Sequence, residues 1–349
     1  MSINHEPDPN SLVVFNYEEE YGPEHNMRPG TWIKPAPMLY FLNAGGIGDY
    51  INYTAALIWV AKNCPWVHGT IYANPYFLEF LNYHIRQFEN WRVMDGASVT
   101  LPHNMAFSGP ELMVNGQNIT HQLCNATGSH LMDLGFQYYA NIQAAPPGTT
   151  LPFMDIPLKK VRWELREKAG KYVVFTPGAV TAVRMTHGRH LNPLIEYVCS
   201  KGLLPVFLGK SEIVKDLNPK FADDIDYHKG LDLRDQTTLL QAAAIMQHAA
   251  CVLGLDNGLL HLAACTPAKV IFGYNITEVK DREPRRTWGK LINVALTKEE
   301  LACVGCQTHW KLIINHTFHK CMYGDNKCID MLFSGGRFER AIDEMLSQV

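Results

Sequence analysis

The sequence predicts an α/β protein with two parallel, doubly wound sheets. Short apolar segments alternate with longer segments whose apolar residues recur at helical spacing, and this alternation starts twice, near residue 38 and near residue 171. Glycine-rich or polar turns follow several of the short segments. Strands and helices that alternate in this way build parallel sheets with helices on both faces.

The first alternation predicts a strand at Met38–Leu42, a glycine-rich turn, and a helix over the largely apolar stretch Tyr50–Ala61. A second strand is expected at Thr70–Ala73 and a second helix at Pro75–Phe88. Residues 95–150 are rich in Gly, Pro, Asn and His and indicate no clear element, and their Pro-Pro-Gly sequence is the best linker candidate.

The second alternation is clearer and predicts seven elements in succession. They are the strand Tyr172–Thr176, the helix Leu191–Lys201 closed by Gly202, the strand Leu203–Leu208, the helix Thr238–Ala250, the strand Cys251–Leu255, the short helix Leu259–Cys265 and the strand Lys269–Phe272. From Phe338 to Val349, apolar side chains recur on one face of a final helix.

Length and composition agree with two domains. The 349 residues allow two domains of ordinary size, and 47% hydrophobic with 19% charged residues excludes a disordered chain. We expect an irregular segment at 1–37, an N-terminal domain at 38–165, a C-terminal domain at 166–296, a cysteine module at 297–332 and a C-terminal helix at 333–349.

The charge balance gives no sign of a general nucleic-acid or membrane binder. Lys and Arg total 31 against 34 Asp and Glu, a formal net charge of −3, although a local basic groove is not excluded. No apolar stretch approaches the ~18 residues of a membrane span, and the polar first residues lack a leader pattern. Together with an odd count of nine cysteines, these features predict a cytoplasmic protein.

Ligands of open parallel sheets bind at the carboxyl ends of strands, and three turns here could form such a site. The first is Gly45-Gly46-Ile47-Gly48-Asp49, which is not a G-x-G-x-x-G dinucleotide motif. Gly46 and Gly48 would let a ligand approach the backbone. Asp49 heads the following helix and is a candidate base for an attacking hydroxyl, or else only a helix cap.

The second turn runs from Pro177 to Arg184. A hydroxyl at Thr181 and a guanidinium at Arg184, just beyond a strand, suit a phosphate. Arginine offers fixed donors to a diphosphate leaving group. The alternative is an ordinary surface arginine.

The third turn is Asp256-Asn257-Gly258, which opens the helix that contains His261. Asp256 or Asn257 can cap this helix, and its N-terminus would favour a phosphate. His261 lies a little over one turn along the helix, where it would orient the loop or touch the ligand. A histidine buried in the core is the alternative.

Four of the nine cysteines, Cys303, Cys306, Cys321 and Cys328, fall within 26 residues. Four thiolates with one C-x-x-C arm can bind Zn²⁺ or Fe in a tetrahedron, and His309, His316 or His319 could replace one of them. Free thiols or two disulfides are the alternatives, and a cytosolic chain favours the metal. Such a site has no open coordination position, so its role would be structural.

Together these turns resemble glycosyltransferase family 9, the heptosyltransferases. The resemblance is carried, in matching order over roughly residues 38–275, by Gly-Gly-Ile-Gly-Asp49, by Pro177-Gly-Ala with a cation beyond it, by Leu208-Gly-Lys210-Ser-Glu212 and by Gly254-Leu-Asp256-Asn-Gly258-Leu-Leu-His261. The last block fits the family's Asp-[Ser/Thr]-Gly-x-x-His motif except that Asn257 replaces the hydroxyl residue. Arg184 stands where the family usually has lysine.

The resemblance implies a GT-B fold, with an N-terminal acceptor domain, a C-terminal nucleotide-sugar domain, a cleft between them and a C-terminal helix that returns to the first domain. It implies that Asp49 is the base, that Arg184 binds the diphosphate and that Glu212 binds the ribose. The turn from Asp256 to His261 would bind the donor phosphates and sugar, with Lys210 nearby.

The implied reaction is an inverting transfer, most simply from ADP-heptose. Asp49 would remove the acceptor proton, while Arg184 and the helix after Asp256 stabilise the departing diphosphate. No Asp-x-Asp metal motif accompanies these turns, so we expect transfer without Mg²⁺.

The four cysteines narrow the resemblance to bacterial autotransporter heptosyltransferases, a branch near family 9. That branch carries a four-cysteine iron site late in the chain and modifies protein hydroxyls. The spacing match is approximate, so iron is favoured over zinc but both are retained.

The acceptor stays open among a lipopolysaccharide core sugar, a protein Ser or Thr, and a modified nucleic-acid base. The basic stretch Lys280–Lys290 could meet a polyanion or form a solvated face. The oligomeric state, a homo-oligomer included, is open as well. The competing hypothesis is a non-catalytic interaction protein with a vestigial nucleotide site and a docking cysteine module. A dehydrogenase is disfavoured because G-x-G-x-x-G is absent.

Overall fold

The computed structural model describes residues 37–42, 46–96, 113–114, 117–118, 130–140, 142–179, 182–211, 224–306, 321 and 326–347. The chain divides into two compact units. The first contains residues 1–45, 52–120 and 132–147, and the second contains residues 46–51, 121–131 and 148–349. Parallel strands dominate both units, which confirms the predicted α/β class. The predicted domain limits at 165 and 296 stay a prediction.

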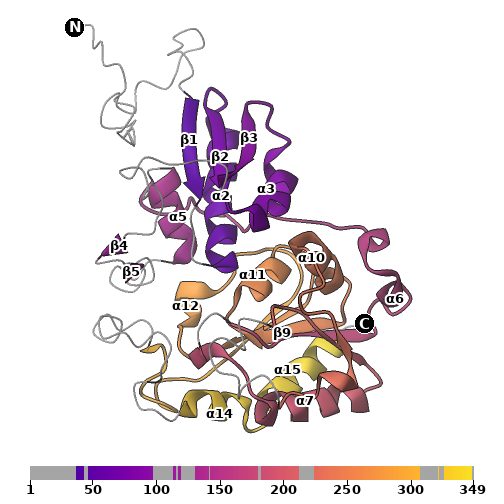
Figure 1. Cartoon of the computed structure of the whole chain (residues 1–349). Coiled ribbons are helices and arrows are strands. Elements are labelled where there is room, and N and C mark those ends of the chain that lie inside the picture. The colour runs from indigo at the N-terminus through magenta and orange to yellow at the C-terminus, as the bar shows by residue number, and fades with distance from the viewer. Residues whose placement is uncertain are drawn as a thin grey trace, which may run out of the picture. The chain divides into compact units, whose positions relative to one another are not determined.

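The first unit is built on a three-stranded parallel sheet in the order β1-β2-β3 (Figure 1). Its main elements are β1 (Pro37–Leu42), α2 (Ile47–Asn63), β2 (His68–Ala73), α3 (Leu78–Ile85), β3 (Trp91–Asp95) and α5 (Leu131–Tyr139), with a short antiparallel pair β4 (Met113–Val114) and β5 (Gln117–Asn118). The start of α2, as far as Ile51, and Leu131 at the start of α5 belong to the second unit. Asn74 caps the 3₁₀ turn Pro75–Phe77 that leads into α3, because its side chain accepts from the N–H of Tyr76.

The second unit is built on a six-stranded parallel sheet in the order β11-β10-β9-β6-β7-β8. Its strands are β6 (Tyr172–Thr176), β7 (Leu204–Phe207), β8 (Leu231–Asp232), β9 (Cys251–Leu255), β10 (Val270–Tyr274) and β11 (Leu291–Ala295). In chain order this is the Rossmann arrangement 3-2-1-4-5-6, whose switch point lies between β6 and β9. Every residue of β6, β9 and β10 is buried, as expected of central strands covered on both faces.

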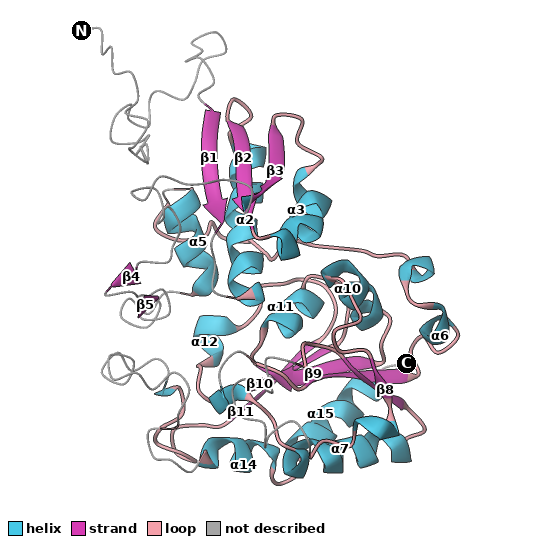
Figure 2. Cartoon of the chain, viewed as in Figure 1, coloured by secondary structure: helices cyan, strands magenta, loops and turns pink. Residues whose placement is uncertain are grey.

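Helices cover both faces of this sheet (Figure 2). On one side lie α7 (Gly188–Ser200) and α15 (Arg337–Leu346), and on the other α10 (Leu239–Gln247) and α11 (Gly258–Ala264). The unit also contains α6 (Trp163–Arg166), α12 (Val279–Arg282), α14 (Lys327–Phe333) and the 3₁₀ turns Leu158–Lys160, Ala182–Arg184 and Tyr227–Lys229. None of the described helices is long and apolar enough to cross a membrane.

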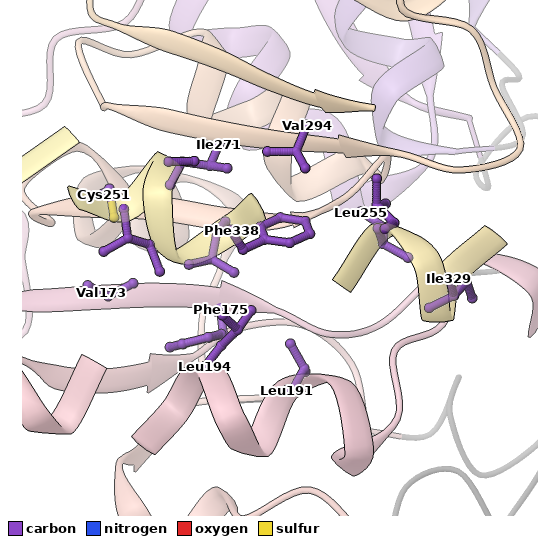
Figure 3. Packing of buried hydrophobic residues seen from close by; sticks show 14 of the residues in the cluster. Val173, Phe175, Leu191, Leu194, Cys251, Leu255, Ile271, Val294, Ile329 and Phe338 are labelled. Carbon is purple, nitrogen blue, oxygen red and sulfur yellow. The ribbon is translucent and has the colours of Figure 1, made fainter. Parts of the chain in front are cut away.

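The C-terminal helix corrects one expectation. The resemblance implied that it returns to the N-terminal domain, but Phe338, Ala341, Ile342 and Met345 of α15 are buried in the core of the second unit. Figure 3 shows Phe338 among side chains of the sheet, with Ile271, Val294 and Leu255 around it. The amphipathic pattern predicted the helix and its apolar face, whereas the surface that covers this face depends on the chain path.

The predicted elements of the second alternation are present with small changes at their ends. Tyr172–Thr176 and Cys251–Leu255 are strands with the predicted bounds. The strands β3, β8 and β11 were not predicted. β8 has only two residues, and no residue of β8 and only one of the five in β11 is buried. Such short or half-exposed edge strands lack the continuous apolar run of a central strand.

Candidate active site

The carboxyl ends of β6 and β9 are joined by Asn257. The two strands pair in parallel with Thr176 opposite Gly254. The Asn257 amide Nδ2 donates to the carbonyl and to Oγ1 of Thr176, each at 3.0 Å, and to the carbonyl of Gly178 at 3.3 Å. Its Oδ1 accepts from the N–H of Leu260 at 3.1 Å and so caps α11. A serine or threonine hydroxyl could cap the helix but could not supply all of these bonds.

Asp256 is the centre of a buried polar cluster. Its Oδ1 lies 3.3 Å from Nε2 of His261, and its Oδ2 accepts from the Thr277 hydroxyl at 3.0 Å. Nη1 of Arg184 donates to the Asp256 carbonyl at 3.1 Å and lies 3.6 Å from Oδ2. Arg184, His261 and Thr277 therefore surround the carboxylate.

The cluster keeps Asp256 charged. Burial by itself would raise the pKa of this carboxyl, but the hydrogen bond with His261 and the charges of Arg184, His261 and Arg282 hold it far below its usual range. Burial also lowers the pKa of the Arg184 guanidinium, while the charge of Asp256 opposes this shift. A guanidinium remains protonated in such a place, so Arg184 and Asp256 form a buried ion pair at the switch point.

Two glycines let the first turn of α2 approach α11. A Cβ on Gly48 would lie 2.8 Å from Cδ2 of His261, and a Cβ on Gly258 would lie 2.4 Å from Cβ of Ile47. Neither contact is tolerated by a real side chain, so both positions require glycine. Packing thus explains the glycines at positions 48 and 258, whereas a Cβ on Gly46 would make only an ordinary contact, at 3.5 Å from Oδ2 of Asp49.

Asp49 is the third residue of α2 and is 9% exposed. Its Oδ1 lies 3.7 Å from Nη1 of Arg282, which is the last residue of α12 and is 6% exposed. The charge of Arg282 also lowers the pKa of Arg184, and the charge of Asp49 raises it. Two carboxylates and two guanidinium groups thus form one buried electrostatic network.

The structure brings together most of the predicted site residues, namely Gly46, Gly48, Asp49, Arg184, Asp256, Asn257, Gly258 and His261. Lys210 follows β7, where its Nζ lies 3.9 Å from Asp235 and the side chain is exposed. Thr181 and Glu212 lie outside the described residues.

Sequence reasoning missed Thr277 and Arg282. Thr277 follows β10 at the same edge of the sheet, and a turn after a third central strand was the signal that could have found it. Arg282 was counted in a basic surface stretch, but it is buried, whereas its neighbour Lys280 is exposed and pairs with Glu278. Composition alone does not distinguish these two cations.

The four cysteines all belong to the second unit, and three of them act electrostatically on the fourth. Burial, and then the nearby thiols of Cys306, Cys321 and Cys303, raise the pKa of the Cys328 thiol to about 12. Cys306 and Cys321 pack against the apolar core that includes Cys328. All-sulfur chemistry suits iron or zinc. However, no three His, Cys, Asp or Glu side chains in the described part of the chain are arranged to hold a metal ion. The predicted metal module is therefore not assembled in this geometry.

A sheet in this strand order, with buried cationic and carboxylate side chains at its switch point, is a doubly wound α/β arrangement. The profile of glycosyltransferase family 9 (heptosyltransferase) matches residues 129–313, more than half of the chain. The chain belongs to this family and is a glycosyltransferase. It matches no curated protein.

Solved structures share the fold at low sequence identity. TibC, an iron-containing dodecameric glycosyltransferase from enterotoxigenic E. coli H10407, is 14% identical with a TM-score of 0.63, and the match covers 90% of this chain and 80% of that chain. A family 9 glycosyltransferase from Veillonella parvula is 12% identical with a TM-score of 0.54, over 89% and 96% of the two chains. The ADP-heptose lipopolysaccharide heptosyltransferase II of E. coli is 12% identical with a TM-score of 0.53, over 80% and 98%.

Proposed function

We propose that this glycosyltransferase moves a heptose from ADP-heptose to an acceptor hydroxyl, with inversion at the anomeric carbon. The family supports the donor class, and TibC, which shares the fold, has been solved in complex with ADP-D-β-D-heptose. The observation that carries the proposal is the buried network of Asp49, Arg282, Arg184 and Asp256 at the switch point.

In the proposed reaction, Arg184 receives the donor diphosphate. Its guanidinium is fixed by the carbonyl and carboxylate of Asp256, and part of its surface stays exposed. A cation held in place before the reaction stabilises the charge that develops on the leaving ADP without further rearrangement. The side chain of Asp256 is already occupied, so it acts on the donor through Arg184 and His261.

Asp49 is the proposed base. The acceptor hydroxyl gives its proton to the Asp49 carboxylate as its oxygen bonds to the anomeric carbon, and the bond between that carbon and the diphosphate breaks. Arg282 lies next to Asp49 and holds this carboxylate in place. Its positive charge also adds to that of Arg184 on the side of the leaving group.

The proposed transfer needs no Mg²⁺, because the Arg184 guanidinium rather than a metal ion contacts the diphosphate. The single Asp-x-Asp triplet of the sequence, Asp224-Ile225-Asp226, has local partners instead. Asp224 accepts from the N–H of Gly188 at the start of α7, and Asp226 pairs with Lys229.

We propose that the four cysteines bind a structural iron or zinc ion. The support is their mutual approach, their all-thiol chemistry and the fold shared with iron-containing TibC. The acceptor is proposed to be a lipopolysaccharide core sugar or a protein Ser or Thr, with a modified nucleic-acid base as the least favoured choice. A cytoplasmic homo-oligomer is proposed too, with dodecameric TibC as the precedent for assembly.

Thermal unfolding with ADP, UDP, GDP or no nucleotide tests the donor. A ligand present at 100 times its dissociation constant stabilises the folded state by ~2.7 kcal/mol, which is a visible shift. We expect a shift with ADP that is lost in Asp256→Ala. A shift with UDP or GDP alone would replace the proposed donor, and no shift with any nucleotide would favour the non-catalytic interaction protein.

A further inference from the structure

The side chain of Asn275 links the 3₁₀ turn Ala182–Arg184 to Cys328, one of the four cysteines. Asn275 follows β10 and is fully buried. Its Nδ2 donates to the carbonyl of Val183 at 2.7 Å and lies 3.9 Å from Sγ of Cys328. Since Val183 directly precedes Arg184, this amide fixes the backbone at the base of the arginine side chain.

Helix α14, which carries Cys328, also contacts the start of α7, which follows the 3₁₀ turn. Oδ1 of Asp330 lies 2.7 Å from Nε2 of His190 and 2.9 Å from Nη2 of Arg189, in the first turn of α7. Just before α7, the Thr186 hydroxyl donates to the carbonyl of Pro177 at 3.2 Å. This bond links the start of α7 to the residue that follows β6. Helix α14 therefore contacts this part of the chain twice, through Cys328 by way of Asn275 and through Asp330 at the start of α7.

Asn275 is also close in sequence to a residue that contacts Asp256. Two residues further on, Thr277 donates to Oδ2 of Asp256. The short stretch 275–277 therefore contacts the Arg184 segment through one residue and the Asp256 carboxylate through another. A displacement of Asn275 would therefore act on the backbone next to Arg184 and, through Thr277, on one partner of the Asp256 carboxylate.

Packing does not explain the choice of asparagine here. Oδ1 of Asn275 is buried and has no hydrogen-bond partner among the described residues. A buried unpaired oxygen lowers stability, and a leucine with the same number of heavy side-chain atoms would avoid it. What asparagine adds is the Nδ2 donor, which binds Val183 and approaches Cys328.

We propose that Asn275 is a positioning residue that couples the cysteine cluster to Arg184 and thereby sets the affinity for the nucleoside diphosphate. A group that holds the Cys328 sulfur in place would restrain Asn275 and, through Val183, the backbone next to Arg184. The proposal rests on the proposed function, because it assigns Arg184 to the diphosphate.

The test is a set of ADP titrations followed by calorimetry, or by ligand-observed NMR where binding is weak. Asn275→Leu removes the donor, and Thr266→Val is the matched control. Thr266 is a fully buried residue of the same unit that hydrogen-bonds to Ala263, outside the Arg184 segment. We expect Asn275→Leu to weaken ADP binding about fivefold, the equivalent of one hydrogen bond, and Thr266→Val to leave it unchanged. Asn275→Ser serves if the leucine variant fails to fold.

A double-mutant cycle separates positioning from general destabilisation. In an Arg184→Met background, Asn275→Leu should have no further effect on ADP affinity, and in a Cys328→Ser background its effect should shrink. Equal losses with and without Arg184, or no loss in Asn275→Leu, would overturn the coupling while leaving ADP binding by the wild type as evidence for the proposed function. If the wild type binds no ADP, the proposed function fails, and this inference fails with it.

Discussion

Nη1 of Arg282 lies 3.7 Å from Oδ1 of Asp49, and both side chains are buried in the second unit. A buried ion pair contributes little net stability when both partners are present, but loss of one partner leaves an uncompensated charge. Loss of Arg282 would therefore affect both the stability of this region and Asp49, the proposed base.

Arg282→Met should lower both stability and transfer. We expect a loss of about 3 kcal/mol in the free energy of unfolding, because the Asp49 carboxylate stays buried without its partner. The transfer rate should fall at least tenfold. Chemical denaturation and a coupled assay for ADP release would measure these effects. Lys280→Met, at an exposed position two residues earlier, is the control and should change neither. Wild-type activity in Arg282→Met would exclude a role in the reaction.

Asp49→Asn should separate chemistry from donor binding. The amide keeps the size of the side chain but cannot take up a proton, so transfer should fall by roughly 10²–10⁴. ADP affinity should stay within a few fold of the wild type, because Asp49 is not assigned to the diphosphate. Asp155→Asn, an exposed carboxylate of the second unit, is the matched control. Retained turnover in Asp49→Asn would place the base elsewhere.

Asn257→Ser tests whether the amide has a function beyond the cap. Serine can still accept from the N–H of Leu260, so α11 should keep its cap. The bonds from Nδ2 to Thr176 and Gly178 would be lost, at a cost of about 1–2 kcal/mol in stability. Because these bonds join the Arg184 turn to α11, ADP affinity should fall as well. Unchanged melting temperature and affinity would show that serine is equivalent at this position.

Metal content tests the cysteine cluster directly. The full chain, purified under reducing conditions without added metal, should carry about one iron or zinc ion, as expected of a closed four-thiolate site. Elemental analysis by mass spectrometry would identify and count the ion. Cys328→Ser should lose it, whereas Cys199→Ser, at an exposed position on α7, should keep it. An equal metal content in the two variants, or none in the wild type, would contradict the proposed site.

The sequence predicted the second sheet well because the signals of its strands are local. The central strands are continuous apolar runs, and each ends in a polar turn whose residues meet at one edge. This brought Arg184 and Asp256 to one edge without knowledge of the contacts. Asp49 follows β1 of the other sheet, and only the family resemblance grouped it with them. Asn257 was predicted as a donor ligand, and the structure adds its role in joining two turns.

What the sequence could not predict depends on contacts between distant segments. Arg282 and Lys280 are cations two residues apart, and only the tertiary environment buries one and exposes the other. The bond from Asn275 to Val183 joins residues 92 positions apart and leaves no pattern in either segment. The expected packing of α15 on the N-terminal domain was wrong for the same reason, because an apolar face does not indicate which surface covers it.

The first unit contains a buried histidine that should make its stability depend on pH. His84 on α3 is 4% exposed, and Nε2 has no hydrogen-bond partner among the described residues. Burial lowers the pKa of His84 to about 3, so the folded chain keeps this ring neutral at pH values where the unfolded chain protonates it near pH 6.5. The unfolded state then binds more protons, and stability is lost as the pH falls from about 6.5 toward 3.

His84→Phe removes this titration and keeps an aromatic ring next to Phe80 and Tyr83. Between pH 6.5 and 4, the unfolding midpoint of this variant should fall less steeply than that of the wild type. A full effect of one buried histidine amounts to about 1.4 kcal/mol per pH unit in this window. His68→Gln, at an exposed position, should keep the wild-type slope. Equal slopes for His84→Phe and the wild type would show that this histidine is protonated in the folded chain, and the acid sensitivity would then come from other groups.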